Sequence, residues 1–250
     1  MRPVGGSWTL TWLEHALPGD ALAQRLALAR RLGLALEVAN RPGLDPRALR
    51  SARAPIVTLQ AFGMHEAHPL HPDPERRRAG ERHLVDTIER AAELGVPRVI
   101  AACGFGEAAC AEPFESCRAF FERVAPRARE RGVRVLIEPL SPRRSPAMDQ
   151  PEDVERLLSA LAAPDVFGTV LDTGHLLDGG HDPERILRGW PHRVDEVQLR
   201  GARSEPPPPG APLGRWLACL REPPEVVCIE HRAPITVARV EELVAELRAL

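Results

Sequence analysis

Four short polar motifs follow apolar, β-branched runs in the 250-residue chain, and they contain the side chains best suited to chemistry. They are IEP with Glu138, LDTGH with Asp172 and His175, VQL with Gln198, and IEH with Glu230. Carboxylates that meet in one place repel and raise each other's pKa, and a divalent cation removes that repulsion. Oxygen donors suit Mn²⁺, Mg²⁺ or Co²⁺, and Zn²⁺ stays open. We therefore expect one divalent metal ion and a metal-dependent enzyme.

Strand-like and helix-like segments alternate along the chain that carries these motifs. Strands are expected at residues 7–12, 34–38, 55–62, 98–103, 133–138, 167–172, 194–199 and 226–230. Amphipathic helices are expected at residues 19–32, 73–94, 112–131, 151–161, 183–190, 213–221 and 236–250. Strands that alternate with helices in this way predict an α/β fold, a (β/α)₈ TIM barrel that forms a single domain over residues 1–250. A doubly wound open sheet is the alternative, although no strand precedes a glycine-rich dinucleotide fingerprint.

In a barrel, the carboxyl ends of the strands form the face that carries the active site. Glu138, Asp172, Gln198 and Glu230 fall at or near the ends of the last four expected strands. We expect these side chains to converge on the barrel axis as metal ligands, the alternative being four separate rim residues. Two irregular loops, residues 141–150 and 201–211, lie on the same face, and the proline run in the second predicts a rigid rim or lid.

Other polar side chains on this face are candidates for substrate binding. Glu37 ends the second expected strand, and His65 and His68 follow the third. Each could contact substrate hydroxyl groups, but a rim salt bridge for Glu37 and a solvated loop for the histidines are the plain alternatives.

Three arginines of this face could bind a carboxylate or phosphate through a two-pronged contact, and we assign Arg232 to the substrate ahead of Arg200 and Arg203.

Composition narrows the class of protein. The chain has 33 basic and 35 acidic side chains and a formal net charge of −2, so no nucleic-acid partner is expected. Its 5 cysteines include no close C-x-x-C pair for zinc or redox chemistry. Neither a secretory leader nor a membrane-spanning run is recognisable, so we expect a cytoplasmic enzyme with no membrane partner and a small-molecule substrate.

The motifs together resemble those of the xylose isomerase-like TIM barrels, the sugar phosphate isomerase/epimerase superfamily, over essentially the whole chain. The resemblance rests on Glu138, the Asp-x-x-His of Asp172 and His175, Glu230, and the A-x-x-L-G of residues 91–95. It implies that the three carboxylates bind a metal and that His175 lies beside them or contacts substrate. Epimerases of this family usually have histidine where this chain has Gln198, and glutamine there resembles the 3-dehydroshikimate dehydratase branch. The resemblance also allows a homodimer.

The leading functional hypothesis is a metal-dependent isomerase or epimerase of a small sugar or hydroxy-keto acid, acting through an enediolate. In it, Glu138 and Glu230 face opposite sides of the substrate and exchange the roles of base and acid. The alternative is a metal-dependent dehydratase, a lyase, in which His175 is the base and a β-hydroxyl group leaves. Proton exchange without loss of water would separate the two. An endonuclease acting at abasic sites, which would need additional histidines, and a catalytically silent binding protein are weaker readings.

Overall fold

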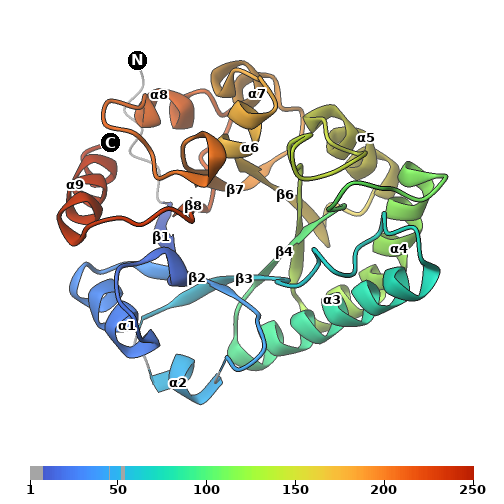
Figure 1. Ribbon diagram of the computed structural model, residues 1–250, viewed down its shortest axis with the longest axis horizontal. Helices are drawn as coiled ribbons and strands as arrows, with labels where there is room; N and C mark the ends of the chain where they lie inside the picture. Colours follow the sequence, from blue (N-terminus) through green and yellow to red (C-terminus); the bar gives the residue numbers. More distant parts are fainter. Residues whose placement is uncertain (1–7, 45, 52–53) are drawn as a thin grey trace.

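The computed structural model describes residues 8–44, 46–51 and 54–250. Parallel strands close into a barrel in the order β1 to β8, and helices surround them (Figure 1). The strands are β1 (Thr9–Leu13), β2 (Ala35–Ala39), β3 (Ile56–Gln60), β4 (Arg98–Ala102), β5 (Arg134–Glu138), β6 (Phe167–Asp172), β7 (Val194–Leu199) and β8 (Val226–Ile229). The predicted (β/α)₈ barrel is confirmed, and the open-sheet alternative is wrong because β1 pairs with β8.

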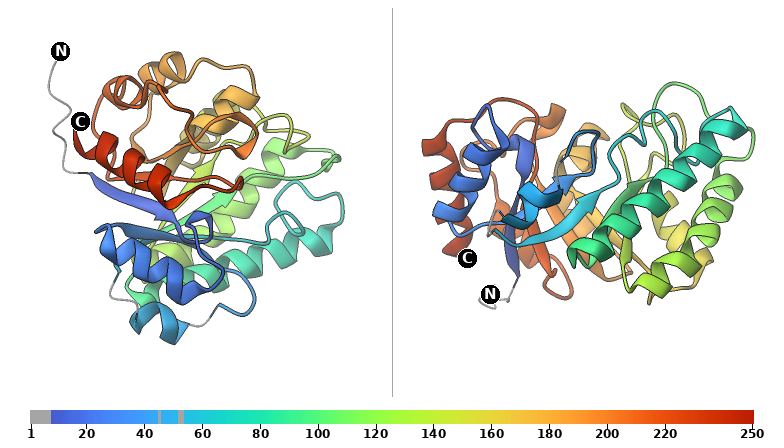
Figure 2. Two further views of the ribbon diagram at one scale, coloured as in Figure 1. Left: turned by 60° about the vertical axis from the view of Figure 1, so that its left-hand side comes forward. Right: turned by 90° about the horizontal axis from the view of Figure 1, so that it is seen from below.

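The helices cover the outside of the barrel. They are α1 (Leu22–Arg31), α2 (Pro46–Ser51), α3 (Pro74–Leu94), α4 (Pro113–Arg131), α5 (Pro151–Leu161), α6 (Thr173–Asp178), α7 (Pro183–Gly189), α8 (Leu213–Ala218) and α9 (Val237–Arg248), with 3₁₀ turns η1 (Glu14–Ala16) and η2 (Ala202–Ser204). The long helices α3 and α4 run side by side along one flank (Figure 2). The sequence did not predict α2 or α6. The first predicted strand began at Ser7, which lies outside the described residues.

Local sequence explains how the two long helices begin and end. The carboxylate of Asp73 accepts the N–H of Glu75 and so caps the first turn of α3, and Pro74 follows as its first residue. Gly95 and Gly132 end α3 and α4 with φ angles of 70° and 65°. Glycine adopts this left-handed conformation without a steric penalty, and the chain then turns directly into the next strand.

The alternation of side chains along the strands positions the site. Ile100, Leu136 and Val170 face the barrel axis and pack against one another. Because residues two apart on a strand share a face, Glu138 and Asp172 lie on the same face as Leu136 and Val170, one step nearer the carboxyl end. These three strands therefore present apolar side chains to the middle of the axis, and β5 and β6 present acidic ones at its carboxyl end. Among the described helices, none is long and apolar enough to cross a membrane.

Candidate active site

A cavity of about 510 Å³ opens at the carboxyl end of the barrel. Its polar wall includes Glu138, Glu230 and His175, and it also includes Arg144, Arg200, Arg232, Gln60, His15, His65 and His231. Phe62 and Phe105 contribute apolar wall. Carboxylates and guanidinium groups thus face one another across a partly apolar space, which suits a small polar molecule.

Asp172 joins β6 to α6 and is fully buried. Its Oδ1 accepts the N–H groups of Gly174 and His175, at 2.7 and 3.3 Å, and so caps α6. The same oxygen accepts Nε of Arg200 at 2.8 Å, while Nη2 of Arg200 lies 2.6 Å from Oδ2. Burial by itself would raise the pKa of Asp172, but Arg200 and these donors hold it below its ordinary value. Asp172 is therefore an anion in a two-pronged ion pair.

His175 lies one turn into α6, with Nε2 at 3.8 Å from Glu138 Oε1 and 3.9 Å from Asp172 Oδ2. Burial lowers its pKa to about 4, so the ring is neutral near pH 7. The backbone N–H of Ser141 donates to Nδ1 at 3.2 Å. Because a backbone N–H can only donate, Nδ1 carries no proton and Nε2 carries it. His175 therefore presents an N–H donor to the carboxylates.

Glu138 and Glu230 are the two carboxyl groups exposed to the cavity. Burial, with the charges of Glu230 and Asp172, raises the pKa of Glu138 well above its ordinary value. Burial likewise raises the pKa of Glu230 to about 7, against the opposing effect of Arg200. Gln60 donates to Glu230 Oε2 at 3.0 Å. Carboxyl groups with raised pKa values can exchange protons with a substrate near neutral pH.

A second polar group lies deeper along the axis. Gln198 is fully buried, its Nε2 donates to Glu37 Oε1 at 2.8 Å, and its Oε1 has no hydrogen-bond partner among the described residues. Burial raises the pKa of both Glu37 and Glu196, and Thr58 donates to Glu196 at 2.7 Å. Glu37 thus contacts Gln198 beneath the cavity instead of projecting into it.

Among the His, Cys, Asp and Glu side chains that the structure describes, two groups offer atoms close enough to share a metal ion. Glu138, Asp172 and His175 form one, and Glu37, Glu196 and Cys228 the other, each with its candidate ligand atoms within 4.8 Å of one another. We exclude His175 as a ligand in the first group because its Nε2 carries the proton. Of the predicted acidic ligands, the structure brings Glu138 and Asp172 together, while Glu230 lies outside that group.

The donor set nevertheless fits a divalent ion in its chemistry. Oε1 of Gln198 is buried and accepts no hydrogen bond from the described residues, and Oδ2 of Asp172 is buried 2.6 Å from Nη2 of Arg200. Both are oxygen atoms of the kind that Mg²⁺, Mn²⁺ and Zn²⁺ bind. At Oδ2 of Asp172, the positively charged guanidinium group of Arg200 already occupies a position that a metal ion would need.

The predicted substrate-binding residues are divided between the cavity and the core. His65 lines the cavity, its side chain is 52% exposed, and its ring lies edge-on to Phe62. Arg232 also lines the cavity, and its backbone N–H donates to the carbonyl of Ser204. His68, by contrast, is only 2% exposed, and its ring packs edge-on against Phe105. His65 and Arg232 can therefore meet a ligand, whereas His68 supports the loop that carries His65.

Sequence reasoning gave too little weight to Arg200 and assigned no role to Arg144 or Gln60. The signal for Arg200 was its spacing, because Glu196, Gln198 and Arg200 alternate along β7 and its end and so share one face. Gln60 follows Thr58 by the same spacing on β3. For Arg144, in the irregular loop after β5, the sequence contains no comparable signal.

Comparison with known proteins agrees with this architecture. The family model described as xylose isomerase-like TIM barrel matches residues 26–250. No protein of curated function matches the sequence.

Solved structures share the fold at low identity. D-allulose 3-epimerase from Methylomonas sp. is 17% identical, with a TM-score of 0.76 over 96% of this chain and 89% of that one. A D-tagatose 3-epimerase-like protein is 14% identical, with a TM-score of 0.79 over 96% and 97% of the two chains. The IOLI protein with a bound zinc atom is also 14% identical, with a TM-score of 0.76 over 96% of each chain. With the family model covering all but the first 25 residues, this chain belongs to the xylose isomerase-like TIM barrel family.

Proposed function

We propose that this protein is an isomerase or epimerase of a small sugar or hydroxy-keto acid, working through an enediolate. The observation that carries the proposal is the pair of carboxyl groups of Glu138 and Glu230, which line one cavity at the carboxyl end of the barrel. Such an enzyme must take a proton from the carbon beside a carbonyl group and return one. The names of the structural neighbours, D-allulose 3-epimerase among them, support this reaction class.

In this proposal each group has a defined task. Glu138 and Glu230 act as base and acid on the substrate and exchange these roles after proton transfer. His175 donates a hydrogen bond from Nε2–H to a substrate oxygen. Its other ring nitrogen, Nδ1, already accepts the N–H of Ser141, so the neutral ring has no acceptor to offer the substrate. Arg232 and His65 bind and orient substrate from the rim of the cavity. The hydrophobic walls around Phe62 and Phe105 exclude water from the reacting carbon.

A divalent metal ion belongs to the proposal, with Glu138, Asp172, Gln198 and Glu230 as its holders. The unpartnered Oε1 of Gln198 and the carboxylate chemistry of the set support it, and the zinc atom named for the IOLI protein makes Zn²⁺ a candidate beside Mn²⁺, Mg²⁺ and Co²⁺. When bound, such an ion would withdraw electron density from the substrate carbonyl and make the neighbouring C–H more acidic.

Hydrogen–deuterium exchange tests the proposal. The protein, supplemented in turn with each of the four metal ions, is incubated in D₂O with a panel of ketoses and hydroxy-keto acids, and NMR follows deuterium at the carbon beside the carbonyl. We expect incorporation with at least one compound, and a loss of about a thousandfold or more in Glu138→Gln and Glu230→Gln. Full exchange in both variants would remove these residues from the mechanism.

A metal-dependent dehydratase is the second candidate, and Gln198 on β7 is the observation that favours it. The same NMR experiment with 3-dehydroshikimate in the panel separates the candidates, since a lyase releases water and forms a new double bond. The protonated Nε2 of His175 counts against its predicted role as the base of such a lyase, because that nitrogen has a proton to give and none to take.

A further inference from the structure

Arg200 lies in a slot that the fold builds for it. Its backbone N–H donates to Thr173 Oγ1, and that hydroxyl donates to the carbonyl of Arg200, at 2.9 and 2.8 Å. A Cβ atom on Gly174 would come within 2.6 Å of both Cγ and Nε of Arg200. Nη1 donates to Ser204 Oγ at 2.7 Å. The absence of a side chain at Gly174 and the contacts with Thr173 and Ser204 therefore hold the arginine in one place.

In this position the guanidinium group of Arg200 contacts Asp172, a carboxylate proposed to bind the metal. The two side chains are almost completely enclosed, at 3% exposure for Arg200 and 0% for Asp172. Nε and Nη2 contact the two oxygens of Asp172, at 2.8 and 2.6 Å. Oδ1 already accepts the N–H groups that start α6, so Oδ2 is the oxygen left for a cation, and Arg200 lies against it.

The charges around Arg200 are those that a divalent ion would meet. Asp172, Glu230 and Glu138 are the acidic groups that act most strongly on the guanidinium, and they keep it charged in spite of its burial. A metal ion bound to Oδ2 would lie a few ångströms from a full positive charge with little water between them. Like charges in such surroundings repel strongly.

We infer that Arg200 and a divalent cation exclude one another at Asp172. Arg200 is the resident counter-ion of the carboxylates, and it must release Oδ2 before an ion uses that oxygen. Arg200 also lines the cavity, so the released guanidinium enters the space that would hold the substrate. The inference rests on the proposed function for the position of the metal site, but it concerns affinity for the ion and not turnover.

Titration calorimetry with Mn²⁺ alone, on the full-length protein, measures this competition. Arg200→Gln removes the competing charge and keeps a polar side chain, and we expect it to bind Mn²⁺ about tenfold or more tightly than the wild type. Arg200→Lys keeps the charge and should bind close to wild type. Arg232→Gln removes a cavity cation that is not paired with Asp172, and we expect a smaller gain. Equal or weaker binding by Arg200→Gln, equal gains in Arg200→Gln and Arg232→Gln, or no binding by any form would overturn the inference.

A second measurement does not depend on whether the variants fold. In a crystal structure of the wild-type protein soaked with Mn²⁺, we expect an ion on Asp172 Oδ2 and Arg200 Nη2 beyond ion-pair distance of that oxygen. An ion bound there with the ion pair intact would refute mutual exclusion. Neither measurement uses a sugar. Both therefore test the competition between Arg200 and Mn²⁺ even if the protein is inactive toward every compound in the exchange panel.

Discussion

The carboxyl groups of this site differ in protonation because they have different neighbours. Asp172 has a guanidinium group against it and N–H donors from α6, and its pKa is lowered. Among the described residues, Glu230 receives one side-chain hydrogen bond, from Gln60, and burial raises its pKa to about 7. The same functional group, a carboxyl, thus supplies a permanent anion at Asp172 and a group that can exchange protons near neutral pH at Glu230.

The raised pKa of Glu230 predicts a pH dependence of stability in EDTA-treated protein. Between its ordinary pKa of 4.5 and about 7, the folded protein binds a proton that the unfolded chain has released. The contribution of Glu230 to the free energy of unfolding is therefore largest below pH 4.5 and falls as the pH rises through 7, by on the order of 3 kcal/mol. Urea unfolding at a series of pH values should show a shallower fall in Glu230→Gln. Glu246→Gln, an exposed change on α9, should keep the wild-type slope, and a wild-type slope in Glu230→Gln would contradict the assignment.

The ion pair of Asp172 and Arg200 should also appear in stability. Asparagine keeps the ability to cap α6, so Asp172→Asn removes mainly the charge and leaves a buried guanidinium group without its partner. We expect the free energy of unfolding to fall by about 3 kcal/mol in urea denaturation. The control is Asp165→Asn in the pair with Arg129, whose side chains are 57% and 53% exposed, where no measurable change is expected. A similar fall in the free energy of unfolding in both variants would show that the buried pair stabilises the fold no more than the exposed one.

Among the elements, the loop after β3 depends on its contact with α3. A Cβ on Gly80 would come within 2.4 Å of the backbone oxygen of Ala67, in the loop that carries His65 and His68. Gly80→Ala should therefore shift this loop, lower the free energy of unfolding by about 1–3 kcal/mol and raise KM more than it lowers kcat. Thermal unfolding and steady-state kinetics on an active compound measure both effects.

Gly189 is the matched control for this change. It ends α7, and a Cβ there would meet nothing within 4 Å. Gly189→Ala should leave KM unchanged and stability unchanged or slightly raised. If Gly80→Ala behaved in the same way, the loop would not depend on that close approach.

The eight strands could be predicted from the sequence because their apolar β-branched runs are bounded by clear signals, such as Gly95 and Gly132 at helix ends. Helix α6 was missed because Asp172 is both the last residue of β6 and the cap of α6, with no loop between them. Arg200 was given too little weight for a different reason. The sequence places it on the same face as Gln198, but which partner a long side chain takes is decided by three-dimensional contacts, here by the space that Gly174 leaves.

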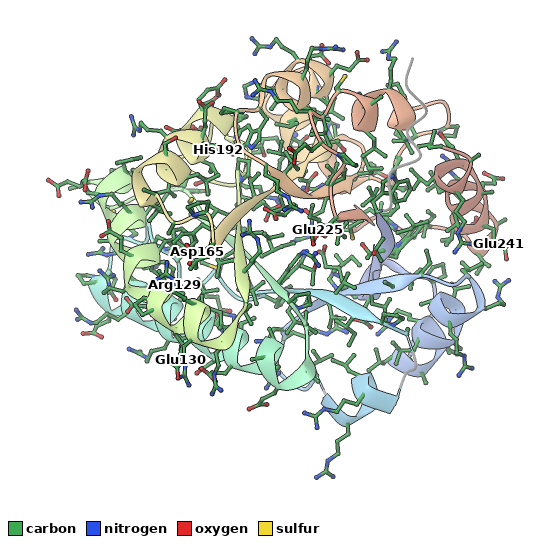
Figure 3. All side chains as sticks on the ribbon, turned by 180° about the vertical axis from the view of Figure 1, so that it is seen from behind. Arg129, Glu130, Asp165, His192, Glu225 and Glu241 are labelled. Carbon is green, nitrogen blue, oxygen red and sulfur yellow. The ribbon has the colours of Figure 1, made fainter. Side chains whose placement is uncertain are left out.

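For the whole molecule, the two ends of the barrel differ in their chemistry. The cavity lies at the carboxyl ends of the strands, while charged pairs gather where the strands begin. Arg134 Nη2 donates to Asp195 Oδ2 at 3.0 Å, and Arg98 pairs with Glu225. Figure 3, the view from behind, shows Glu225 near the centre of the barrel and the pair of Arg129 and Asp165 farther out. In barrels of this kind, the end at which the strands begin contributes to stability and the opposite end carries the active site.

This division predicts that stability and activity can be changed separately. Asp195 is fully buried and packs where a Cβ on Gly168 would come within 1.9 Å of its Oδ2. Asp195→Asn weakens its pairing with Arg134 and should lower the free energy of unfolding by roughly 1–3 kcal/mol. Proton-exchange activity in the folded variant, measured well below its melting temperature, should match the wild type. A specific loss of activity there would mean that the two ends are coupled.

The direct joint between β6 and α6 has a consequence for how this scaffold can diversify. A single aspartate ends the strand, starts the helix and pairs with Arg200, so an insertion at this point would disturb all three roles together. The segments after β3, β5 and β7 are longer connections, and they contribute His65, Arg144 and Arg200 to the cavity wall. Changes of substrate preference should therefore accumulate in those three segments, with the β6–α6 junction kept as an invariant anchor.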